Sequence, residues 1–159
     1  MSGIRTPRFY VIAGVNGAGK SSIAGVTFRE LGSDYFNPDE AARRLMAANS
    51  GLSQKDANGI AWRQGVRLLQ RALEERLDFA FETTLGGQTI TQLLSQAASQ
   101  GIEIHIWYVG LTSPELHLER VRARVSRGGH DIPESDIRRR YEHSRLNLIA
   151  LLPHLTALR

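Results

Sequence analysis

Short apolar runs alternate along the chain with longer segments in which apolar residues recur at helical spacing. Three runs rich in β-forming residues predict buried strands, at 8–13, 78–83 and 102–111. Weaker runs predict a short strand at 34–37 and a last strand of almost no length at 155–158. The intervening segments predict helices over 19–31, 39–48, 53–77, 89–99, a segment starting at Pro114, and a segment from Pro133 to about Leu152.

Capping residues indicate where several of these helices begin and end. We expect Gly32 to close the first helix, since glycine is the usual residue just beyond a helix end. Asn37 is expected to cap the next helix, with Pro38 in its first turn. Ser113 and Pro114 repeat this arrangement. Strands alternating with helices predict an α/β fold, a parallel sheet with helices on both faces.

The segment 14–21, GVNGAGKS, matches the phosphate-binding pattern G-x-x-x-x-G-K-[ST] at every fixed position, between a predicted strand and a predicted helix. In such a loop the backbone N–H groups converge on phosphate oxygens, and the following helix directs its positive end at the same anion. The match predicts a P-loop NTPase three-layer sandwich that binds ATP or GTP with Mg²⁺. The expected nucleotide-binding residues are Gly14, Asn16, Gly17, Ala18, Gly19, Lys20, Ser21 and Ser22.

Within this loop, Lys20 is expected to reach the β- and γ-phosphates and Ser21 to ligate Mg²⁺ through its hydroxyl group. Asp39 follows the second predicted strand, at the sheet edge where parallel folds place their ligands. It can act as the base that accepts a proton from a substrate hydroxyl, or simply stabilise a helix N-terminus. Glu82, with Thr83 and Thr84 after it, is expected to bind substrate or to hold magnesium through water; the alternative is a solvated strand end.

Arg120, Arg124 and Arg127 share one helical face by their i, i+4 and i+3 spacing, and Arg122 points elsewhere. Guanidinium groups in this position can stabilise a transferring phosphoryl group, so we expect these three to be catalytic; a solvated charged face is the alternative. In the run 138–140, consecutive arginines point in several directions, so at most two can face a site and solvated charge is the favoured interpretation.

Composition adds a preference for anionic ligands. The chain has 159 residues, suiting one domain over 1–159, and a formal charge of +4 with 18 arginines and only two lysines. Arginine matches phosphate oxygens well, but this charge is modest and no basic stretch carries interleaved aromatic residues, so nucleic acid is not expected as a partner. No apolar run is long enough to span a membrane, no signal peptide is recognised and cysteine is absent, which suits a cytoplasmic protein.

Four segments, in this order and spacing, resemble the zeta-toxin-like P-loop proteins of bacteria: AGVNGAGKSS, FNPDEAARRL, FETTLGG and RVRARVSRGGHDIPESDIRRRYEHS. The resemblance covers about residues 8–150. The P-loop is common to many NTPases, and the other three segments are more specific. The family is related to small kinases and phosphorylates the 3′-hydroxyl of UDP-N-acetylglucosamine with ATP or GTP, which blocks cell-wall precursor synthesis. The resemblance also implies a helical lid and an antitoxin as a candidate partner.

Carried over residue by residue, the resemblance implies that Asp39 is the base, that Lys20 and Ser21 bind nucleotide and Mg²⁺, and that Glu82 and Thr84 contact substrate. The arginine spacing differs from the family pattern, so the two lid arginines are not assigned individually. The family also has a further C-terminal strand, beside the P-loop, and we expect the end of this strand region to be lacking here. Residues alone leave open a kinase of a nucleoside, an antibiotic or an RNA end, and a nucleotide-dependent switch or NTPase without a small-molecule acceptor.

Overall fold

The computed structural model describes residues 5–30 and 35–159. Within these ranges no helix is long and apolar enough to cross a membrane. The elements follow the order β1 (Arg8–Ala13), α1 (Lys20–Glu30), α2 (Pro38–Ala48), α3 (Gln54–Glu74), β2 (Phe79–Thr83), α4 (Gln88–Ser99), β3 (Glu103–Tyr108), α5 (Pro114–Val125), α6 (Glu134–Leu151), a 3₁₀ turn η1 (Leu152–His154) and β4 (Ala157–Leu158).

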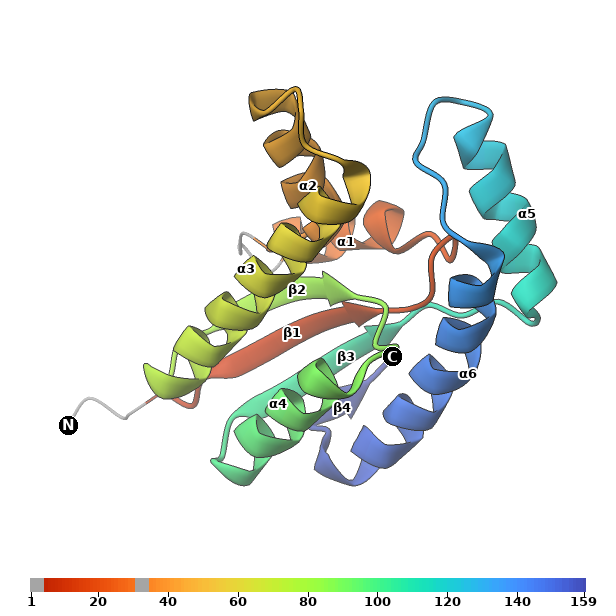
Figure 1. The fold of residues 1–159 in the computed structure, drawn as a ribbon. Coiled ribbons are helices and arrows are strands. Elements are labelled where there is room, and N and C mark those ends of the chain that lie inside the picture. Colours follow the sequence, from red (N-terminus) through yellow and green to blue (C-terminus); the bar gives the residue numbers. More distant parts are fainter. Residues whose placement is uncertain (1–4, 31–34) are drawn as a thin grey trace.

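The strands form one parallel sheet in the order β2-β1-β3-β4 (Figure 1). β1 is paired along its length with β2 and β3, so Val11 lies opposite Phe81 on one side and Ile106 on the other. This central position explains why β1 is almost entirely apolar and buried, as expected for a strand covered on both faces. The carboxyl ends of all these strands therefore meet at one edge, where the P-loop begins.

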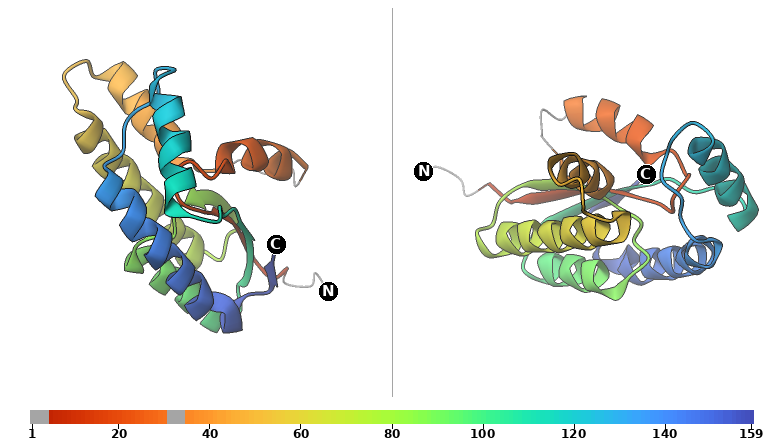
Figure 2. Two further views of the ribbon diagram at one scale, coloured as in Figure 1. Left: turned by 90° about the vertical axis from the view of Figure 1, so that its right-hand side faces the viewer. Right: turned by 45° about the horizontal axis from the view of Figure 1, so that its top comes forward.

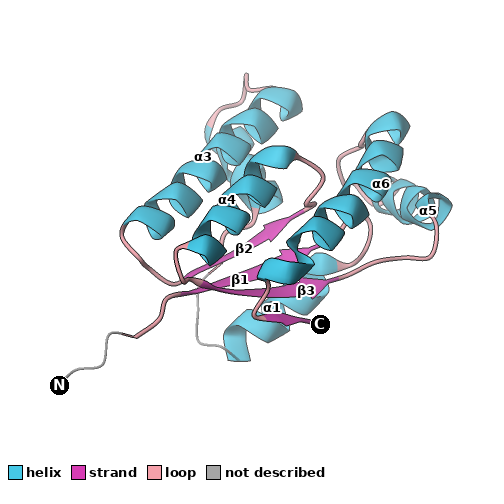
Figure 3. Ribbon diagram, turned by 90° about the horizontal axis from the view of Figure 1, so that it is seen from below, coloured by secondary structure: helices cyan, strands magenta, loops and turns pink. Residues whose placement is uncertain are grey.

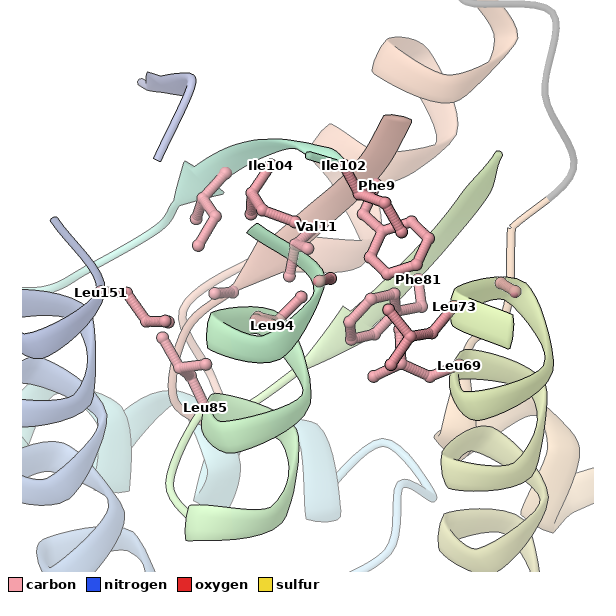
Figure 4. Packing of buried hydrophobic residues seen from close by; sticks show 14 residues of the cluster. Phe9, Val11, Leu69, Leu73, Phe81, Leu85, Leu94, Ile102, Ile104 and Leu151 are labelled. Carbon is pink, nitrogen blue, oxygen red and sulfur yellow. The ribbon is translucent and has the colours of Figure 1, made fainter. Parts of the chain in front are cut away.

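Helices cover both faces of the sheet unequally. In Figure 3, α3, α4 and α6 lie on one face and α1 on the other. Alternate residues of β1 divide between them: Phe9 and Val11 pack in the core under α3, α4 and α6, while Tyr10 and Ile12 pack with Phe28 of α1. Figure 4 shows the larger core, in which side chains of β1, β2 and β3 meet those of α3, α4 and α6. The three-layer α/β prediction is confirmed.

One strand prediction needs correction. The predicted strand at 34–37 is reduced to a single bridge between Phe36 and Phe81, with Phe36 N–H donating to Ala80 O at 2.9 Å; position 34 lies outside the described residues. Because Asn37 and Pro38 begin a helix at once, no length is left for a strand. The short last strand predicted at 155–158 is present as β4, which pairs with β3 at the sheet edge with His105 opposite Ala157.

Most of the remaining boundaries are confirmed within two residues. Asn37 caps α2 through its Oδ1, which accepts from Asp39 N–H at 2.9 Å, and Ser113 caps α5. The third predicted helix ends at Glu74, earlier than expected, and β3 ends at Tyr108. The predicted closure by Gly32 falls outside the described residues.

Two helical arms rise beyond the carboxyl ends of the strands. α2 and the first half of α3 form one arm, and α5 with the start of α6 forms the other, as both views in Figure 2 show. The arms pack through small separate cores, Ala42 with Ala57 and Ala61 in the first, and Val121 with Ile137 in the second. The second arm is the helical lid predicted from the sequence.

Candidate active site

The loop after β1 is tied to both neighbouring strands. Gly14 N–H donates to Thr83 O at 3.1 Å, and Val109 N–H donates to Ala13 O at 2.8 Å. A side chain at position 14 would be impossible without movement, since its Cβ would lie 2.3 Å from Val109 O. Gly19 has φ +95, a conformation that glycine adopts without strain. These features hold the loop in a tight turn ahead of α1, the geometry that presents backbone N–H groups to an anion.

Lys20 begins α1 and folds back over this turn. Its Nζ donates to Gly14 O at 2.7 Å. Burial lowers the pKa of the Lys20 ammonium, while the negative charges of Glu82 and Asp39 act in the opposite direction. The ammonium is therefore held in the loop by a carbonyl and nearby carboxylates, in a position that an incoming phosphate can exploit.

His117 supports the loop from below. It lies on α5, is 1% exposed, and its Nδ1 lies 2.9 Å from Asn16 O, a bond in which the ring nitrogen donates. Burial lowers the pKa of His117, so the imidazole is neutral at physiological pH. The sequence did not identify this residue, because a lone histidine on a helix shows no pattern that points to a loop 101 positions away.

A hollow with a volume of about 1090 Å³ opens over the loop. We call it the P-loop cleft. It lies between the two arms, with Asp39 and Glu82 at its base and the lid arginines along one wall. Its lining is formed by residues Asn16, Gly17, Gly19, Lys20, Ser21, Ser22, Asp39, Arg43, Met46, Gln54, Glu82, Arg120, Ala123, Arg124, Arg127, Gly128, Gly129 and His130. Gly14 and Ala18 do not line it, although their carbonyl groups accept from Lys20 and Arg120.

A second hollow of about 420 Å³, the side pocket, adjoins the cleft. Its wall includes Trp62 of α3, Thr83 at the end of β2 and Thr84 in the loop that follows, together with residues between His130 and Arg140. Four residues line both hollows: Asn16, Asp39, Glu82 and His130. Asp39, in the first turn of α2, therefore stands where the two spaces meet.

Glu82 is the most constrained carboxylate of the site. It is 5% exposed, and its Oε1 is buried with no hydrogen-bond partner. Burial raises its pKa to about 7, a change opposed by the positive charge of Lys20 and reinforced by the charge of Asp39. A carboxyl group in this state can accept or share a proton near neutral pH and retains an oxygen for a ligand.

Arg120, Arg124 and Arg127 all face the P-loop cleft, the arrangement that their spacing predicted. Arg120 donates to Ala18 O at 3.3 Å. Arg124 has Nε and Nη2 buried without a partner, and its stem packs closely against Gly129. Unpaired buried donors of a cation are costly, so an anion in the cleft would satisfy them. Arg122 lies outside the cleft and bonds Glu134 on the exposed surface.

Sequence reasoning missed two arginines. Arg140 lines the side pocket and donates to Asn16 Oδ1 at 2.8 Å, whereas Arg138 and Arg139 form ion pairs outside it. The helical register of Arg140 could have identified it, since position 140 shares a helix face with buried Ile137 and Ser144. Arg43 lines the P-loop cleft four residues after Asp39, on the same face of α2.

Nucleotide and metal groups fit this arrangement on two observations. The unpaired guanidinium atoms of Arg124 are suited to phosphate, and Gly17, Gly19 and Lys20 of the loop line the same cleft. Ser21 lines the cleft together with the carboxylates of Asp39 and Glu82, all oxygen donors of the kind that Mg²⁺ prefers. Among the described residues, no cluster of three or more His, Cys, Asp or Glu side chains is placed to hold a metal ion.

A family model described as zeta toxin matches residues 1–155. A protein of Haemophilus influenzae (strain ATCC 51907 / DSM 11121 / KW20 / Rd), described as uncharacterized, is 33% identical over 132 residues, covering 80% of this chain and 88% of that protein.

Solved structures share the fold at low identity. A chain of the PezAT chromosomal toxin–antitoxin system of Streptococcus pneumoniae is similar with a TM-score of 0.65 and 17% identity, over 97% of this chain and 66% of that one. A gluconokinase from Sinorhizobium meliloti 1021 is similar with a TM-score of 0.54 and 19% identity, over 97% of this chain and 82% of that one.

Proposed function

The chain belongs to the zeta toxin family, and from that premise we propose that it is a kinase that transfers the γ-phosphoryl group of ATP or GTP to a hydroxyl group of a small molecule. One observation carries the proposal: a cleft over the P-loop and a separate side pocket meet at Asp39 and Glu82. A pure NTPase or nucleotide switch needs the first space only, whereas a kinase needs a second for its acceptor.

In this proposal the chain's own residues position the phosphates. The loop amides and Lys20 hold the β- and γ-phosphates, and the helix dipole of α1 favours their charge. Mg²⁺, bound at Ser21, would neutralise charge on the phosphate oxygens. Asp39 faces the acceptor from the first turn of α2, orients its hydroxyl group and accepts the proton as the bond to phosphorus forms.

The lid arginines stabilise the transferring group. Arg124 is the first candidate, because its unpaired donors already lie in the cleft, and Arg120 and Arg127 lie on the same wall. In well-studied phosphotransferases an arginine of this kind contributes about 10³–10⁵ in rate. Glu82 and Thr84 contact the acceptor on the side-pocket wall.

UDP-N-acetylglucosamine is the acceptor that the family resemblance implies, and an antitoxin that covers the cleft is a candidate partner. The similar Streptococcus pneumoniae structure is a toxin–antitoxin system, which supports testing both. Other hydroxyl compounds, such as nucleosides and antibiotics, use the same chemistry and belong in the same assay.

The decisive experiment incubates the protein with MgATP and each member of a panel of hydroxyl compounds, including UDP-N-acetylglucosamine, and separates the products by anion exchange. We expect a phosphorylated acceptor in one reaction, absent with Lys20→Ala and Asp39→Ala. ADP formed at the same rate with every acceptor and without any would replace the kinase with an NTPase. Repeating the successful reaction with MgGTP shows which nucleotide is preferred.

A further inference from the structure

The two hollows carry opposite charge. The P-loop cleft is lined by five cationic side chains and two carboxylates: Lys20, Arg43, Arg120, Arg124 and Arg127 against Asp39 and Glu82. The side pocket is lined by four carboxylates and one cationic side chain: Asp39, Glu82, Asp131 and Asp136 against Arg140. His130 lines both. The charge of the P-loop cleft therefore favours phosphate binding, whereas the charge of the side pocket disfavours it.

The single arginine of the side pocket is already engaged. Arg140 donates to Asn16 Oδ1 at 2.8 Å, so its guanidinium supports the P-loop. One pocket carboxylate, Asp136, is offset by Arg139 at 2.9 Å, but Arg139 itself does not line the pocket. Asp131 lies in the loop before α6, and its Oδ1 accepts from the neighbouring Ile132 N–H, which leaves its charge unopposed. The pocket thus has an excess of negative charge after its internal pairs are counted.

The unpaired oxygen of Glu82 is a further sign that a ligand belongs here. Glu82 is 5% exposed and its Oε1 is buried with no partner, while the residue lines the side pocket as well as the cleft. A buried oxygen that accepts nothing is uncommon in folded proteins and is satisfied most simply by a donor on a bound molecule. Ammonium and hydroxyl groups are donors, whereas a phosphate dianion is an acceptor only.

The lining of the pocket also includes aromatic and apolar side chains. Trp62 of α3 is 50% exposed yet lines the pocket, as do Phe36 and Val66. Phe36 packs so closely on Gly65 that a Cβ there would lie 2.7 Å from the ring. Exposed tryptophan faces bind the apolar face of sugar-like rings and also attract cations. The volume of about 420 Å³ is near the lower end of small-molecule pockets, roughly 300–1,000 Å³.

We propose that the acceptor is a compact, amine-bearing hydroxyl compound with a ring, of the amino-sugar or aminocyclitol class, and not a sugar nucleotide or phosphate ester. Its ring lies against Trp62, its ammonium group faces Asp131 and Glu82, and its reacting hydroxyl reaches Asp39. In the transfer step that hydroxyl oxygen bonds the γ-phosphorus, the bond to the β-phosphate oxygen breaks, ADP leaves and Asp39 takes the proton. This inference rests on the proposed kinase function and narrows its acceptor.

Binding measured without turnover tests the inference separately from catalysis. The chain has two tryptophans, and Trp107 packs with Tyr10 and Phe28 on the α1 side of the sheet. A Trp107→Phe protein therefore reports through Trp62 alone. With Mg²⁺ and a non-hydrolysable ATP analogue present, its fluorescence would be titrated with four probes at neutral pH: glucosamine, N-acetylglucosamine, glucosamine 6-phosphate and UDP-N-acetylglucosamine.

We expect glucosamine to bind about tenfold or more tightly than glucosamine 6-phosphate, with N-acetylglucosamine between them, since tenfold reflects one moderate charge interaction. Asp131→Asn should weaken glucosamine several-fold and leave N-acetylglucosamine unchanged, while Glu142→Gln, on an exposed part of α6 outside the pocket, should alter neither. Tightest binding by UDP-N-acetylglucosamine, equal binding of glucosamine and its 6-phosphate, or no response to glucosamine overturns the inference. Binding of glucosamine without phosphorylation of any acceptor would instead contradict the kinase function and leave the pocket assignment intact.

Discussion

A single buried carboxyl group, Glu82, links the site to the stability of the protein. Burial raises its pKa from the ordinary 4.5 to about 7, so the folded state binds a proton that the unfolded chain has released between these values. The contribution of Glu82 to the free energy of unfolding is therefore complete below about pH 4.5 and is lost as the pH rises through about 7.

We predict that Glu82→Gln changes the pH dependence of unfolding. Between about pH 4.5 and 7 the free energy of unfolding of the wild type should fall relative to the variant by about 1–3 kcal/mol, since each pKa unit corresponds to about 1.4 kcal/mol. Urea titrations of both proteins, without nucleotide, across this range measure the difference. Parallel curves, with no divergence above pH 4.5, would contradict the shifted pKa.

Asp39 gives a second test at the scale of one side chain. Asp39→Asn keeps the size of the residue but removes the proton acceptor, so we predict a fall in kcat of about 10²–10⁴ for phosphotransfer, the usual contribution of a general base. Nucleotide affinity should change little, because Lys20 and the lid arginines that line the cleft still hold the phosphates. Glu40→Gln, one residue further along α2 and outside both hollows, is the matched control and should retain activity. Full activity in Asp39→Asn would remove this residue from the mechanism.

At the scale of elements, α6 turns one arginine of a run of three toward the loop. Arg140 donates to Asn16 Oδ1 and its stem packs against Gly86, while Arg139 pairs with Asp136 at the surface. We predict that Arg140→Ala lowers kcat/KM by about 10–100-fold, since a hydrogen bond to a charged group is worth about 1.5–3 kcal/mol. Arg139→Ala should lie within about twofold of wild type, as exposed ion pairs contribute little. Equal losses in both variants would show that only the total charge of the run matters.

Elements carried by a strong local pattern could be predicted from the sequence. β1 and the P-loop were recognised because an apolar run, a glycine-rich turn and a helix start follow one another. Asn37 and Ser113 cap the two helices that they were predicted to cap. The strand at 34–37 failed because pattern alone could not show that Phe36 would make a single bridge before the helix began.

The residues of the site divide in the same way. Positions next to strand ends or in helical register, such as Asp39, Glu82 and Arg124, were identified, and the structure brings them together around two hollows. Arg140 and His117 were missed because their contacts with Asn16 join parts of the chain more than 100 positions apart. The charge contrast between cleft and side pocket could not be predicted either. Both linings take residues from the same few segments, and only the folded structure shows which residue faces which hollow.

At the scale of the whole molecule, the site leaves charged groups without partners that a ligand can supply. The two arms pack through separate small cores, and the P-loop cleft lies between them. Unpaired donors of Arg124 and the buried, partly neutralised charge of Lys20 are destabilising without an anion. A nucleotide phosphate group would pair with both side chains, so nucleotide binding should raise the melting temperature.

We predict that MgATP at about 100 times its Kd raises Tm by about 5–10 °C, from a linkage of about 2.7 kcal/mol and about 2–4 °C per kcal/mol for a domain of this size. Lys20→Ala should lose most of this shift while its own Tm without nucleotide stays the same or rises, because the variant no longer buries a charged group. Asp39→Asn should keep most of the shift, since Lys20 and the loop amides still hold the phosphates. Differential scanning calorimetry of the three proteins separates these cases. A Lys20→Ala protein that keeps the wild-type shift would mean that nucleotide binds elsewhere, and the cleft would then lose its role as the phosphate site.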